Sequence, residues 1–297
     1  MQKFSRRDAL AGVAGFAAAG ALPGLLTAAE PGMTARQVFE AIRVATRQNW
    51  NPNASDDCIH FGDLNTRVTG IATSFYATMD TLKTAQAAGL NYIIPHECTF
   101  YERSDDLAQS VIPDNDATLT AKMKFLRDNH MVVQRMHSHS HSLNGDVVRV
   151  ALLEQLGWTQ YRVESSPIVA CRIPVATAME VGRHIKTACG RRTMRMFGDP
   201  QKKVSLINIS PGMPGESPQI AQMDMEGVDA VLLGEVREPE VIGYAQDLAE
   251  RKSLVVYLSG HTAEDYGSRL LANWLGGVFP GLPVRWVPIV DPYINPA

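Results

Sequence analysis

The chain has 297 residues, of which 45% are hydrophobic and 20% are charged, so it is long and apolar enough to bury one large core or two smaller ones. This composition excludes disordered and fibrous proteins. The formal net charge of −3 offers no basic stripe for the phosphates of a duplex, so we expect a small-molecule substrate and no nucleic acid as partner.

Residues 1–29 have the plan of a cleavable signal peptide. The stretch begins with charged residues, continues with an apolar run rich in Ala and Gly, and has small residues near Ala29. Arg6 and Arg7 resemble the pair of a twin-arginine export signal. The apolar run is short and interrupted by glycine, which argues against a membrane anchor. We therefore expect a periplasmic or secreted protein without stable membrane insertion.

Helical and strand-like patterns alternate along the rest of the chain. Apolar periodicity predicts helices over 34–49, 78–89, 118–129, 145–157, 238–252 and 263–279. Short apolar runs rich in β-branched residues predict strands over 68–77, 90–95, 130–136, 228–236 and 253–260. Strands that alternate with helices indicate an α/β fold.

The middle of the chain has a different pattern. Residues 164–218 contain three strand candidates around one helix and end in a loop rich in Gly, Pro and Ser. We interpret this segment as an inserted or bridging α+β portion. It would separate a first α/β half over 30–163 from a second over 219–297.

Three of the predicted strands run directly into histidine. His96 and Glu97 follow one strand, His137 follows the next, and His261 follows the last. In open α/β sheets, ligands bind outside the carboxyl ends of the strands. One such histidine is usually structural, but three of them at equivalent places favour a shared site.

Further candidate ligands stand close to these histidines. His139 and His141 follow His137 at alternate positions, and Glu264 and Asp265 follow His261. Imidazole and carboxylate without thiolate suit zinc, manganese or iron. Because the ligands exceed one tetrahedral shell, we expect two divalent metal ions per chain, with a metal-bound hydroxide as nucleophile.

The spacing of the run HSHSH leaves its local geometry open. In an extended chain residues 137, 139 and 141 share one face, whereas in a helical turn 137 and 141 are neighbours. Either geometry brings His137 and His141 together, and the role of His139 stays open. A surface histidine-rich loop with adventitious metal affinity is the alternative.

Four motifs in this order carry a family resemblance. HECTFY, HSHSH, GEVRE and SGHTAEDYG resemble the NGG-one-interacting-factor-three family, also described as dinuclear metal centre hexameric proteins and as GTP cyclohydrolase I type 2-like. The resemblance covers nearly the whole mature chain. It implies two related α/β halves around a metal pair and assembly into a toroidal homohexamer.

The resemblance also implies a ligand set with three departures from the family pattern. The predicted metal ligands are His96, Glu97, His137, His141, His261 and Glu264. Glu97 stands where the family has a second histidine, and His141 stands where it has an aspartate. Glu264 lies one residue closer to His261 than usual, so Asp265 stays open as the alternative ligand.

Other residues have weaker claims to a role. Glu235 lies near the end of a predicted strand and is either an acid/base residue or one that supports the site, with a capping or salt-bridge role as the alternative. Arg191, Arg192 and Arg195 could hold an anionic substrate, although a solvated basic turn is the commoner arrangement. The chain contains neither a GxGxxG nor a GxxxxGK[ST] motif, so no nucleotide cofactor is expected.

These observations predict an exported metal-dependent hydrolase. Two alternatives stay open: a metal-binding or scaffold protein without turnover, and a metal-dependent lyase or isomerase acting on a carbohydrate. The four cysteines form no CxxC pair, and the sequence does not choose between disulfides and buried thiols.

Overall fold

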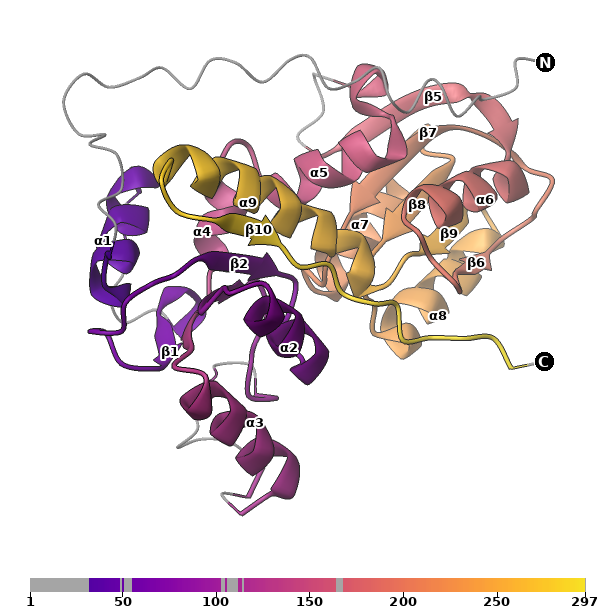
Figure 1. The fold of residues 1–297 in the computed structure, drawn as a ribbon. Helices are drawn as coiled ribbons and strands as arrows, with labels where there is room; N and C mark the ends of the chain where they lie inside the picture. Colours follow the sequence, from indigo (N-terminus) through magenta and orange to yellow (C-terminus); the bar gives the residue numbers. More distant parts are fainter. Residues whose placement is uncertain are drawn as a thin grey trace.

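The computed structural model describes most of the chain that follows the predicted signal peptide. The described residues are 32–296 apart from 49, 51–54, 103–104, 106–111, 114 and 164–167. The predicted signal peptide lies outside the described residues. Two five-stranded sheets form the molecule, each with helices packed against it (Figure 1), which confirms the α/β prediction.

The first sheet is parallel except at one edge. Its strands, in spatial order, are β1 (Ile59–Phe61), β4 (Val132–Gln134), β3 (Tyr92–Pro95), β2 (Ile71–Ser74) and β10 (Val284–Trp286). Only β1 is antiparallel to its neighbour. Its helices are α1 (Ala35–Ala45), α2 (Met79–Ala87), α3 (Ala117–Asp128) and α9 (Asp265–Val278).

Alternate residues of each strand face opposite layers of this first sheet. Ile71 packs into a core with α1 and α9, whereas Ala72 packs into a second core with α2 and α3. The four residues of β2 are all buried. A strand that is apolar on both faces is typical of a parallel sheet covered by helices on both sides.

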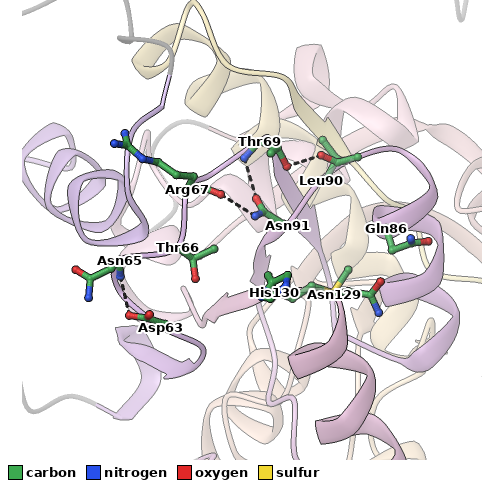
Figure 2. Close-up of a pocket in the computed structure, with 12 residues that line it drawn as sticks. Asp63, Asn65, Thr66, Arg67, Thr69, Gln86, Leu90, Asn91, Asn129 and His130 are labelled. Atoms are coloured by element: carbon green, nitrogen blue, oxygen red, sulfur yellow. Dashed lines mark hydrogen bonds between the residues drawn. The ribbon is translucent and has the colours of Figure 1, made fainter.

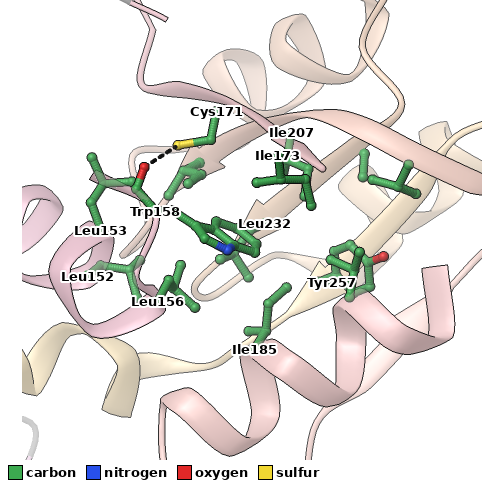
Figure 3. Close-up of a cluster of buried hydrophobic side chains, with 14 of the residues drawn as sticks. Leu152, Leu153, Leu156, Trp158, Cys171, Ile173, Ile185, Ile207, Leu232 and Tyr257 are labelled. Carbon is green, nitrogen blue, oxygen red and sulfur yellow. Dashed lines mark hydrogen bonds between the residues drawn. The ribbon is translucent and has the colours of Figure 1, made fainter. Parts of the chain in front are cut away.

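The second sheet has the same layered plan with antiparallel strands at both edges. Its strands, in spatial order, are β5 (Ala170–Thr177), β7 (Lys203–Ser210), β8 (Ala230–Leu233), β9 (Val255–Leu258) and β6 (Arg195–Phe197). Its helices are α5 (Val147–Leu156), α6 (Ala178–Ala188), α7 (Glu216–Asp224) and α8 (Glu238–Ala249). Figure 3 shows the core between the sheet, α5 and α6, where Trp158 and Tyr257 are the largest side chains.

The sheets do not follow the three ranges predicted from the sequence. The segment 164–218 supplies β5, β6 and β7, and β7 pairs in parallel with β8 of the following range. This segment is therefore part of the second sheet. At the other end of the chain, β10 returns to the first sheet and pairs with β2. The C-terminal segment after β10 then crosses to the second sheet (Figure 1).

Threonine caps and a close glycine contact explain several helix positions. Thr34, Thr78 and Thr177 each accept a hydrogen bond from the backbone N–H three residues on, which satisfies a free donor of the first turn. Helices α5 and α9 pack together where a Cβ on Gly267 would lie 3.0 Å from Val148 Cα. A larger residue at this position would press on Val148 and push the two helices apart by a few tenths of an ångström.

Several simpler features also bear on the sequence predictions. No disulfide joins the four cysteines, and Cys171 and Cys189 are buried. Burial raises the pKa of the Cys171 thiol to about 11 and that of Cys189 to about 12, which makes both thiols poor nucleophiles. Among the described residues, no helix is long and apolar enough to cross a membrane.

Lys122 on α3 gives a pH prediction for stability. It is buried, its ammonium donates to Thr99 O, and it lies 4.5 Å from the centre of the Tyr101 ring. Burial lowers the pKa of Lys122 from 10.5 to about 8. Between these values the folded chain has lost a proton that the unfolded chain keeps, so the free energy of unfolding should rise with pH.

We expect wild type to gain about 1–3 kcal/mol relative to Lys122→Met between pH 7.5 and 10.5 in urea unfolding. Below pH 8 Lys122 is protonated in both the folded and the unfolded chain, so the free-energy cost of burying its charge does not change with pH. The control is Lys124→Met on the same helix, whose ammonium is exposed and pairs with Asp128. A pH profile of Lys122→Met parallel to that of wild type would contradict the prediction.

Candidate functional site

Three imidazoles meet beyond the carboxyl ends of β3 and β4. His96 follows β3, while His137 and His141 lie at the two ends of the turn after β4. One ring nitrogen from each lies within 4.8 Å of the others, a spacing that allows all three to hold one metal ion. The ring centres of His96 and His137 are 4.4 Å apart, and each is 5.0 Å from that of His141. We call these residues the three-histidine cluster.

The run HSHSH is helical, which decides the direction of each ring. His137 is the N-cap of the short helix α4 (Ser138–Ser142), so His137 and His141 are one turn apart on the same side. His139 points elsewhere: its ring stacks on Trp50 at 3.8 Å, and its Nδ1 lies 2.9 Å from Asp57 Oδ2. His139 therefore lies outside the cluster and fixes the loop that carries it.

Two side chains orient the ligand nitrogens. His96 Nδ1 is 3.1 Å from Ser140 Oγ, and His141 Nδ1 is 3.1 Å from Asp146 Oδ1. These contacts leave each Nε2 available. His96 Nε2 is buried and has no hydrogen-bond partner among the described residues, an arrangement that costs free energy unless something binds there. The donor set therefore fits a divalent metal ion.

The imidazoles are held in the form that binds metal. Burial lowers the pKa of His96 well below its usual value, and the neighbouring His137 and His141 lower it further. Burial also lowers the pKa of His137, although the carboxylate of Glu97 opposes this shift. Both rings are therefore neutral at neutral pH, as metal ligation requires.

Asp146 provides a test of the orienting contacts, because it has two separable roles. Its carboxylate also accepts from the backbone N–H groups of Val148 and Arg149 and so caps α5. Asp146→Ser keeps a capping oxygen but is too short to reach His141. We expect zinc affinity to fall about 10- to 100-fold in a competition titration with a chelator. Unchanged affinity would mean that this contact does not orient His141.

Glu97 lies at the edge of the cluster. Its Oε1 is 3.6 Å from His137 Nε2, and its Oε2 accepts from Arg135 Nη2 at 3.0 Å. Arg135 is buried and also donates to the carbonyl of His96. No pattern in the sequence distinguishes Arg135, Ser140 or Asp146. Their contacts depend on the packing of separate segments.

Glu264 approaches the site from the second sheet. It is only 5% exposed, and a Cβ on Gly212 would lie 2.8 Å from Glu264 Oε2, so the glycine leaves room for the carboxyl group. Burial raises the pKa of Glu264 well above its usual value, and the charges of Glu97, Glu235 and Asp146 raise it further. A divalent cation among these carboxylates would favour their ionised forms.

Asp265 has a different task from its neighbour Glu264. Its Oδ1 accepts from the backbone N–H of Phe75 at 3.1 Å and from Trp286 Nε1 at 3.2 Å. Its Oδ2 accepts from the backbone N–H of Ile289 at 3.1 Å. The carboxylate of Asp265 therefore joins α9 to two parts of the first sheet, while Glu264 faces the candidate site.

His261 lies beside the three-histidine cluster and does not join it. Its Nδ1 is 3.3 Å from Glu235 Oε1, and its Nε2 is 3.2 Å from the Tyr76 hydroxyl. The ring of Phe75 stacks against both His261 and His96, at centre distances of 5.7 and 5.8 Å. The hydrogen bond from His261 lowers the pKa of Glu235. Strand ends of both sheets thus contribute to one site.

A separate open cavity of about 590 Å³ lies at the opposite, amino-terminal edge of the first sheet. Figure 2 shows its polar lining, in which Asn91 accepts from the backbone N–H of Thr69 and donates to the carbonyl of Arg67. His130 also lines this cavity. The cavity contains none of the predicted metal ligands and gives a place for control substitutions.

Comparisons with known proteins agree with the fold and the motifs. The family model described as Duf34/NIF3 (NGG1p interacting factor 3) matches residues 33–291. A Bacillus cereus protein related to NIF3 has 13% identity and a TM-score of 0.69, covering 91% of this chain and 100% of its own. The YbgI protein, of unknown function, has 22% identity and a TM-score of 0.68, covering 88% and 100%.

A hypothetical Staphylococcus aureus protein, SA1388, has 15% identity and a TM-score of 0.67, covering 89% of this chain and 99% of its own. At these identities the likeness to solved structures shows the fold alone. No curated protein matches this chain significantly.

Proposed function

This chain belongs to the Duf34/NIF3 family, and from that premise and the three-histidine cluster we propose that it is a metal-dependent hydrolase. The observation that carries the proposal is the buried Nε2 of His96, which lies unpaired within reach of His137 and His141. Three imidazole ligands leave a fourth coordination position for water or substrate, the arrangement of catalytic rather than structural zinc sites.

The residues around the cluster suit hydrolysis. His96, His137 and His141 would hold one divalent ion, and Glu97, His261 and Glu264 are the groups available to a second. Bound zinc, manganese or iron supplies Lewis-acid polarisation and activation of water. The hydrogen bond from His261 lowers the pKa of Glu235, which favours its carboxylate form, and this carboxylate would accept a proton from water.

Two further parts of the proposal concern the setting of the enzyme. Export to the periplasm or the medium is supported by the twin-arginine-like plan of residues 1–29. The absence of a basic stripe in the sequence supports a small-molecule substrate. The family resemblance supports a homohexamer.

The proposal is tested with the full chain loaded with zinc, manganese or iron(II) and a panel of phosphoester, amide and lactone substrates. We expect hydrolysis that a chelator abolishes, that His137→Ala lacks, and that His130→Asn in the distant cavity retains. Hydrolysis that survives in His137→Ala would overturn the assignment. Stoichiometric metal without turnover across the panel would favour a metal-binding protein instead.

A further inference from the structure

Arg191 is a buried cation that the proposed mechanism does not use. It lies in the loop after α6, and its side chain is 4% exposed. Its Nε and Nη1 are both buried without a hydrogen-bond partner among the described residues. A guanidinium group carries five donors, and burying them unpaired costs free energy that a bound anion would recover.

The guanidinium lies next to the part of the candidate site that β9 supplies. Gly260 directly precedes His261 and has φ +68°, and a Cβ on Gly260 would lie 3.1 Å from Arg191 Nη2. Arg191 therefore lies against the backbone of the residue next to His261, after the carboxyl end of β9.

The carboxylate of Asp291 is an anionic group that already lies beside Arg191. Asp291 Oδ2 is 3.6 Å from Arg191 Nε, which is too far for a hydrogen bond. Asp291 instead accepts from the backbone N–H groups of Arg192 at 2.9 Å and Tyr293 at 3.1 Å. It belongs to the C-terminal segment that crosses from the first sheet to the second (Figure 1). Arg191 and Asp291 thus form an ion pair without a hydrogen bond, and Arg191 Nε and Nη1 keep no hydrogen-bond partner among the described residues.

We infer that Arg191 binds an oxyanion of the substrate, a carboxylate or a phosphate group, in a subsite beside His261. The planar fork of an arginine donates two parallel hydrogen bonds to such a group. The inference rests on the proposed function and narrows its substrate class to small anionic molecules. The anion would be held at Arg191 while another part of the same molecule reaches the three-histidine cluster.

The test is calorimetric titration of the full chain with inorganic phosphate and, separately, with acetate, in metal-free and zinc-loaded protein. We expect Arg191→Met to weaken binding about 10- to 100-fold in both forms. Arg192→Met is the matched control, because this neighbouring side chain is exposed, and its affinity should equal that of wild type. The tighter of the two anions identifies the group that the subsite prefers.

A second variant separates anion binding from a purely structural role of Arg191. Asp291→Asn removes the competing negative charge and keeps an acceptor oxygen for one of the two backbone donors, which bond to different oxygens of Asp291, so we expect it to bind the anion roughly 3- to 10-fold more tightly. If Arg191 only anchored the C-terminal segment, this variant would bind no better than wild type. The inference would be overturned if Asp291→Asn bound the anion no better than wild type. It would also be overturned by equal affinity of wild type and Arg191→Met, or by no binding to wild type at millimolar anion.

The two proposals fail in distinguishable ways. Metal analysis of the same samples reports on the three-histidine cluster, whereas the dependence on Arg191 is read in metal-free protein. Loss of metal binding without loss of the Arg191 effect contradicts only the hydrolase proposal. Normal metal binding with no Arg191 effect contradicts only the anion subsite.

Discussion

Replacing His96 by alanine is expected to lower the affinity for Zn²⁺ about 10²- to 10³-fold. His96 is the most buried ring of the cluster, and Ser140 holds its Nδ1 so that Nε2 faces the other two imidazoles. The loss corresponds to one of the few ligand bonds that together give protein zinc sites about 10–16 kcal/mol. Competition with a chelator of known zinc affinity measures it.

Two histidines outside the cluster serve as controls for this experiment. His130→Asn lies at the opposite edge of the first sheet and should leave zinc affinity unchanged. His139→Phe keeps a ring to stack on Trp50 and should cost far less affinity than His96→Ala. Equal losses in His96→Ala and His130→Asn would mean that zinc binds elsewhere.

Asp265→Ala is expected to lower the free energy of unfolding by about 3–5 kcal/mol. The substitution leaves three donors without their acceptor, the backbone N–H groups of Phe75 and Ile289 and the indole N–H of Trp286. Each buried donor that loses its partner costs about 1–3 kcal/mol. Urea unfolding of the metal-free protein measures the change.

Glu264→Gln is the matched control for Asp265→Ala. It lies next in sequence and is equally buried, yet burial and nearby carboxylates disfavour its charge. We expect this variant to weaken metal binding without destabilising the metal-free protein. A loss of under about 1 kcal/mol in Asp265→Ala, or a larger loss in Glu264→Gln, would contradict the division of roles between these two residues.

The parts of the fold that the sequence predicted have strong local patterns. Strands β3, β8 and β9 are apolar runs, β2 and β4 each begin with two apolar residues, and the long amphipathic helices begin at clear caps. No local pattern predicts β1 or β10, and α7 begins within the loop rich in Gly, Pro and Ser that is predicted at the end of the segment 164–218. These short elements are stabilised by pairing with distant segments, which local patterns do not encode.

Part of the candidate site can likewise be predicted from local sequence patterns. Because His96, His137 and His141 follow predicted strands, we expect them at one edge of the sheet, and the structure places their rings together. The direction of His139 depends on Trp50, about ninety residues earlier, and could not be predicted from HSHSH alone. The packing of His261 against Phe75 likewise depends on how the two sheets meet.

The residues that support the site had no recognisable pattern in the sequence. Ser140 and Asp146 orient imidazoles only because α4 is helical and α5 begins where it does. Arg191 appeared in the sequence as one of three arginines in a basic turn. Only the fold distinguishes it from Arg192 and Arg195, because it alone of the three is buried.

The most direct test of the three-histidine cluster is anomalous diffraction at the zinc edge from crystals of the full chain grown with zinc. The structure predicts a peak about 2.0–2.1 Å from one nitrogen each of His96, His137 and His141. A map with zinc bound at other places and no peak between these three rings would contradict it.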